Sequence, residues 1–147
     1  MRWLYMAGIF IAIFTGFGNM PLYKRYYIAD IPGMHWSGDF YLNMMVHYIA
    51  GALVLMATIY FAITFLTSPR RMKLSVLGKV RSVFLGLALF SGGLMALKNL
   101  PGVRFDLAMQ MAGTFFHLGS ALLFFFGSVI AVVTRSKWIK KNRLEFR

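Results

Sequence analysis

The sequence predicts an all-α integral membrane protein, a bundle of four transmembrane helices with both termini in the cytoplasm. Composition is the first reason: 59% of the 147 residues are apolar and 14% are charged, against roughly 25% charge in a soluble domain. The second is that four long stretches carry no charge, and the third is that the basic residues fall unequally on the loops. This composition excludes a disordered chain and a soluble nucleic-acid-binding domain.

The uncharged stretches define the expected helices of a single membrane domain covering residues 1–147. We expect helices at about residues 3–19, 40–67, 79–97 and 107–134. A bilayer needs about 20 apolar residues per helix, with about 17–25 tolerated. The third stretch is the shortest, but Lys79 and Lys98 at its ends can snorkel to the interface. Pro21 and Pro69 follow two of the expected helix ends, a common place for proline.

The connecting segments contain turn and cap signals. The long loop after the first helix contains Ile31-Pro32-Gly33, which indicates a turn. Ser37 or Asp39 is suited to cap the second helix, and Asp106 the fourth.

The distribution of basic residues predicts the orientation. Twelve of the 16 lie at the N-terminus, in residues 70–81 around the start of the third helix, or in the tail at 135–147. The positive-inside rule therefore puts both termini in the cytoplasm, with the tail on the membrane surface. Since topology explains the charge, no nucleic-acid partner is expected. Arg70 and Arg71 are read as a cytoplasmic anchor or a contact to lipid headgroups.

The residue types that are absent or rare limit the kinds of metal site and catalysis that the chain can support. No cysteine is present, so disulfides, thiolate metal sites and Cys-ligated iron–sulfur clusters are excluded. Four acidic residues leave little for carboxylate catalysis, and no catalytic residue is assigned.

Two histidines fall inside uncharged stretches, where ionisable residues are costly and usually functional. His47 lies seven residues into the second helix, and His117 ten residues into the fourth. At about 1.5 Å per residue they lie about 10 and 15 Å deep, both counted from the outer side. Two facing imidazoles at similar depth can ligate one b-type haem. They can also serve only as hydrogen-bonding groups between helices.

Small and polar neighbours fit a flat, bulky ligand. Gly51 follows His47 by four residues and Gly113 precedes His117 by four, so each glycine shares a helix face with its histidine. Glycine lets a macrocycle approach the backbone closely.

Further groups are candidates for fixing the histidine or the haem. Thr114 and Ser120 flank His117 by three residues, and a hydroxyl or a backbone carbonyl can accept its ring N–H. Four outer-side cations can pair with haem propionates: Lys24, Arg25, Lys98 and Arg104.

Other residues keep alternatives open. His35, beside Trp36, is read as interfacial, with a haem, quinone or proton role as the alternative. Methionine is mostly a packing residue, but three lie where an axial ligand is conceivable: Met44, Met45 and Met111.

The stretch from Met20 to Ile28, then Pro32-Gly33 and the helix with His47-Tyr48, resembles the cytochrome b (gamma) subunits of membrane-bound formate dehydrogenases and nickel-iron hydrogenases. The resemblance implies a multi-pass protein of a prokaryotic cytoplasmic membrane. It also implies partners: iron–sulfur and catalytic subunits, membrane lipid and a quinone.

The family also has an inner haem, ligated from the first helix and by a second histidine in the fourth. This sequence has no histidine in the first helix, and Ala131 stands at the second position. The resemblance therefore implies that only the outer haem remains.

The expected function is that of a membrane-anchoring electron-transfer subunit of a respiratory oxidoreductase, using one haem on His47 and His117. The alternative is a haem-free anchor or assembly subunit. A small transporter or channel is a third reading, disfavoured because no acidic or basic residue lies deep in a helix.

Overall fold

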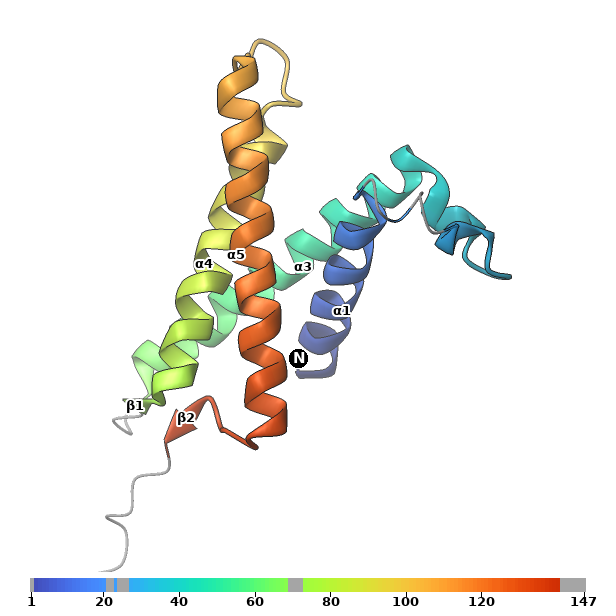
Figure 1. Cartoon of the computed structure of the whole chain (residues 1–147). Coiled ribbons are helices and arrows are strands. Elements are labelled where there is room, and N and C mark those ends of the chain that lie inside the picture. Colours follow the sequence, from blue (N-terminus) through green and yellow to red (C-terminus); the bar gives the residue numbers. More distant parts are fainter. Residues whose placement is uncertain (1, 21–22, 24–26, 69–72, 141–147) are drawn as a thin grey trace, which may run out of the picture. The chain divides into compact units, whose positions relative to one another are not determined.

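The computed structural model describes residues 2–20, 23, 27–68 and 73–140 (Figure 1). The described elements are almost entirely helical, as predicted. The chain divides into two compact units, Met1–Ile63 and Thr64–Arg147, and each is described by itself. Several residues discussed above lie outside the described ones: Lys24, Arg25, Arg70, Arg71 and 141–147.

The first unit contains α1 (Arg2–Gly18) and most of α3 (Phe40–Thr67), which continues into the second unit. Small residues bring the two helices together. A Cβ built on Gly8 would lie 3.1 Å from Cγ2 of Val54, and Ala50 and Val54 are buried. Close backbone approach through small residues is the usual way that helices associate in a membrane.

The loop between α1 and α3 is ordered by aromatic packing against α1. It contains two short 3-10 helices, η1 (Ile28–Asp30) and η2 (His35–Gly38). The turn expected before η2 is confirmed, since Met34 N donates to Ile31 O at 2.9 Å and Gly33 has φ +88°. The Trp36 ring packs on Phe14 with centroids 5.9 Å apart.

The cap predicted for α3 is confirmed at Asp39, whose Oδ1 accepts from Leu42 N at 3.0 Å. Ser37, the other candidate, is buried instead and shares a 2.7 Å hydrogen bond with Tyr23 Oη.

The second unit is built on α4 (Val76–Leu97) and α5 (Leu107–Val133), which run side by side in opposite directions (Figure 1). The predicted cap of α5 is confirmed, because Asp106 Oδ1 accepts from Met109 N at 2.6 Å. The predicted start of α4 at residue 79 is wrong by three residues. Ser75 caps the helix earlier, since its Oγ accepts from Gly78 N at 2.9 Å.

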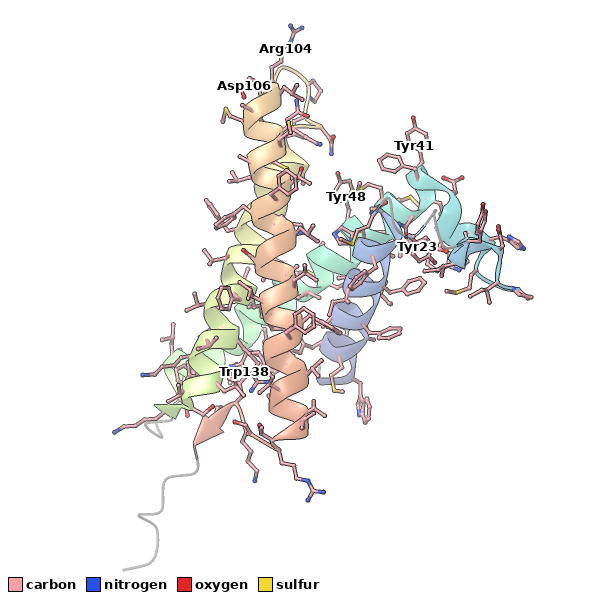
Figure 2. All side chains as sticks on the ribbon, viewed as in Figure 1. Tyr23, Tyr41, Tyr48, Arg104, Asp106 and Trp138 are labelled. Carbon is pink, nitrogen blue, oxygen red and sulfur yellow. The ribbon has the colours of Figure 1, made fainter. Side chains whose placement is uncertain are left out.

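The segment after α5 returns to the start of α4. Ile139–Lys140 (β2) pairs antiparallel with Lys73–Leu74 (β1). Trp138 Nε1 donates to Ser82 Oγ at 2.9 Å, and the Arg81 guanidinium lies 4.2 Å from the Trp138 ring centroid (Figure 2). The first part of the basic tail is thus docked by specific contacts on its own unit.

Three helices are long and apolar enough to cross a membrane, namely α3, α4 and α5. The chain is therefore a multi-pass membrane protein by length and composition. The fourth helix, α1, has 17 residues. At about 1.5 Å per residue it spans about 26 Å, near the lower limit for a bilayer.

Candidate functional site

The His47 site consists of His47 on α3 with Thr15 and Gly16 on α1. His47 Nδ1 lies 2.9 Å from Thr15 Oγ1, and Thr15 is fully buried. The Thr15 hydroxyl has one proton, and it donates this proton to the carbonyl oxygen of Ile11 at 2.7 Å. Its oxygen can therefore accept a hydrogen bond from His47 Nδ1–H.

The His117 site consists of His117 on α5 with Ser91 and Gly92 on α4 and the carbonyl of Ala88. His117 Nδ1 lies 3.0 Å from the carbonyl oxygen of Ala88 and 3.2 Å from Ser91 Oγ. A carbonyl oxygen can only accept, so Nδ1 carries the proton. Ser91 in turn donates to the carbonyl oxygen of Leu87 at 2.7 Å.

The contacts of both histidines are compatible with the same tautomer, which the Ala88 carbonyl requires at His117. A neutral imidazole that is protonated at Nδ1 has its lone pair on Nε2, which is the form that ligates a metal. In metalloproteins the other ring nitrogen of such a histidine almost always donates to a carbonyl, a carboxylate or water. The chemistry of the donor set at each site thus fits a histidine ligand.

A glycine lies against each ring. A Cβ built on Gly16 would lie 3.4 Å from His47 Cε1, and one built on Gly92 would lie 3.0 Å from His117 Cε1. Each of these glycines directly follows the hydroxyl residue that contacts the same ring. A methyl group at Gly92 would press on the His117 ring, whereas one at Gly16 would only touch the His47 ring.

Sequence reasoning missed this duplication. The signal was present as two similar tripeptides, Phe14-Thr15-Gly16 and Phe90-Ser91-Gly92, each in the helix that precedes a histidine-bearing helix. Thr114 and Ser120, the hydroxyls considered on the histidine's own helix, are placed differently. Thr114 donates to the carbonyl oxygen of Gln110 at 2.8 Å, and Ser120 is buried on α5.

The two glycines proposed to admit a macrocycle have different surroundings. A Cβ built on Gly51 meets no atom of the described residues within 4 Å. Gly113 is covered, because Met95 of α4 places its methyl group against it. Of these two glycines, Gly51 therefore has open space at its Cα and Gly113 does not.

The remaining candidates lie at loops or on exposed surfaces. Arg104 is exposed in the loop before α5 (Figure 2), and about 15 Å of helix rise separates the start of α5 from His117. His35 is exposed in η2, and Met45 and Met111 are exposed on their helices.

Asn43 is a buried polar residue that the sequence analysis overlooked. It lies one turn before His47 and is fully buried. Its Nδ2 donates to the carbonyl oxygen of Thr15 and to Asn19 Oδ1, both at 3.0 Å. Asparagine in an apolar helix is itself a signal, because in a membrane it bonds to another helix. Asn43 therefore ties α3 to the residue that contacts His47.

His47 belongs to the first unit and His117 to the second, so their pairing on one haem stays a prediction. Among the described residues, no three or more His, Cys, Asp or Glu side chains gather into a metal site. A haem held by two axial ligands does not need such a group.

Comparison of the chain with protein-family models, curated proteins and solved structures found no match. The two histidine sites therefore carry the functional inference.

Proposed function

We propose that this protein is a membrane-anchoring b-type cytochrome subunit of a respiratory oxidoreductase complex, with one haem ligated by His47 and His117. The observation that carries the proposal is the duplicated hydrogen bonding at the two Nδ1 atoms.

The fit of a haem rests on the donor set of each site. The acceptors are Thr15 Oγ1 for His47 and the carbonyl oxygen of Ala88 for His117. Both hold the ring so that Nε2 is the nitrogen with the lone pair. His47 and His117 would hold the haem, which would supply reversible one-electron transfer when bound; two histidine ligands would favour electron transfer over oxygen binding.

The chain's own contribution is binding and positioning. Thr15 and Ser91 orient the imidazoles, and Gly16 and Gly92 leave room for them. His47 and His117 are both half-buried, and an apolar membrane around them would strengthen the electrostatic influence of these hydrogen bonds.

The proposed partners follow from the absence of any catalytic group in the sequence. Electrons would reach this subunit from an iron–sulfur or catalytic subunit and leave to a quinone, or travel the opposite way. With Ala131 at the position of the inner ligand, quinone exchange at the outer haem, or transfer to another subunit, is the proposed route.

Electron paramagnetic resonance of the oxidised protein, purified with its complex, tests the proposal. We expect a low-spin ferric signal with the anisotropy of two imidazole ligands. A high-spin signal would contradict bis-histidine ligation. An assembled complex whose subunit contains no haem would instead favour the haem-free anchor.

A further inference from the structure

The second unit has a shallow, open-sided cavity of about 390 Å³ that lies between the end of α3 and the start of α4. Its lining is mixed: Phe65 and Leu74 are apolar, and Lys73 and Lys79 are basic. Phe65 lies in the last turn of α3, Lys73 and Leu74 form β1, and Lys79 is in the first turn of α4. The cavity therefore lies where two helices able to span a bilayer leave it.

Defined contacts fix the strand that carries Lys73. β1 pairs with β2, Ser75 N donates to the carbonyl oxygen of Trp138 at 3.0 Å, and Ser75 Oγ donates to that of Lys137 at 2.8 Å. Trp138 is itself held by Ser82 and Arg81. The cavity wall is thus built by the fold.

The positive charge at this end lacks a counter-charge among the described residues. Lys73 and Lys79 make no ion pair with a described residue. Asp106, the described carboxylate of this unit, is at the other end of the α4/α5 hairpin from Trp138 (Figure 2). An anion from outside this part of the chain would supply the counter-charge for Lys73 and Lys79.

We propose that this cavity binds the phosphate headgroup of an anionic glycerophospholipid. Lys73 and Lys79 pair with the phosphate, and the positive end of α4 adds to the attraction. Phe65 and Leu74 contact the glycerol and the upper acyl chain. The apolar half of the lining and its place at the helix ends favour a lipid over free phosphate. This proposal does not depend on haem.

Native mass spectrometry of the full chain, released from nanodiscs of phosphatidylcholine with phosphatidylglycerol, tests the site. We expect preferential retention of phosphatidylglycerol. The Lys73→Gln/Lys79→Gln variant should lose this preference by about 25-fold, since each lysine near an anionic surface is worth roughly fivefold. The Lys73→Arg/Lys79→Arg variant keeps the charge and should retain it.

The matched control is Arg135→Gln/Lys137→Gln, which removes the same charge from exposed positions outside the cavity lining. It should keep most of the preference. An equal loss in the two glutamine pairs, or no preference in the unmodified chain, would overturn the proposal. Displacement of the lipid by inorganic phosphate at equal concentration would assign the site to free phosphate and overturn it as well.

Discussion

The α1/α3 hairpin of the first unit and the α4/α5 hairpin of the second each position one histidine, and they do so with partly different neighbours. Each places a histidine of its second helix against a hydroxyl and a glycine of its first. Around this shared arrangement the neighbours differ. One turn before His47 stands Asn43, fully buried, whereas one turn before His117 stands Gly113, covered by Met95.

The acceptors also differ between the hairpins. Thr15 Oγ1 accepts from His47 Nδ1, while His117 Nδ1 has both Ser91 Oγ and the carbonyl of Ala88. A hydroxyl can be removed by one substitution, but a backbone carbonyl stays. The hydroxyl and the glycine are common to both hairpins, and we infer that they position the histidine. The acceptors differ, and they determine how much one substitution changes the orientation of each ring.

The largest expected effect comes from removing either histidine. His47→Ala and His117→Ala should each abolish haem binding, because one imidazole cannot fill both axial positions. His35→Ala is the control and should retain the haem, since His35 is exposed in η2. Absorbance spectra of the purified variants measure this. Full haem content in both helix variants would refute the assignment of His47 and His117 as the haem ligands.

The next largest effect tests the hydrogen-bond acceptor of His47 against those of His117. Thr15→Val should weaken haem binding by about 10–100-fold, the usual cost of losing a partner that orients a metal ligand. Thr15→Ser restores the hydroxyl and should restore binding. The redox potential of the haem should shift in Thr15→Val and return to the original value in Thr15→Ser. A purely structural role of Thr15 would not produce this shift.

Ser91→Ala should have a smaller effect than Thr15→Val, because the carbonyl oxygen of Ala88 remains 3.0 Å from His117 Nδ1. Haem titration of the two variants side by side measures the difference. A loss in Ser91→Ala as large as in Thr15→Val would show that the carbonyl does not hold the ring.

A third contrast uses the glycines. A methyl group at Gly92 would lie 3.0 Å from His117 Cε1, against 3.4 Å for Gly16 and His47. Gly92→Ala should therefore destabilise its hairpin by about 1–3 kcal/mol through overpacking, and Gly16→Ala by less. Thermal unfolding in detergent, followed by circular dichroism, ranks the two. The reverse ranking would contradict the described ring positions.

The smallest effect concerns the residue found in one hairpin only. Asn43→Leu should cost about 1 kcal/mol, typical of a hydrogen bond between membrane helices. Thr134→Val is the control, because the Thr134 hydroxyl bonds within its own helix to the carbonyl oxygen of Ile130. SDS-induced unfolding of the two variants should show a shift for Asn43→Leu alone.

The sequence predicts the helices and their caps well because these depend on local signals. The α3 bounds and the Asp39 and Asp106 caps agree with prediction. The start of α4 was missed because the charges at Lys79 and Arg81 resemble a loop, although Ser75 had already capped the helix. Arg81 is buried against Gly127 and stacks on Trp138, which lets a charged residue lie within the helix.

The histidine partners could not be predicted from spacing. Residues three or four apart on one helix can be paired from the sequence, which is why Thr114 and Ser120 were considered. Thr15 lies 32 residues from His47 and Ser91 lies 26 from His117. Their contacts depend on which helix faces pack together. Small residues such as Gly8 determine this because they allow two helices to approach closely.

A haem count per chain tests the central claim most directly. It combines a reduced-minus-oxidised absorbance spectrum with a pyridine haemochrome assay on protein purified with its complex intact. The account predicts one b-type haem per chain, lost in His47→Ala and in His117→Ala. An intact complex without haem in this subunit would contradict the account, and two haems would contradict the ligand assignment.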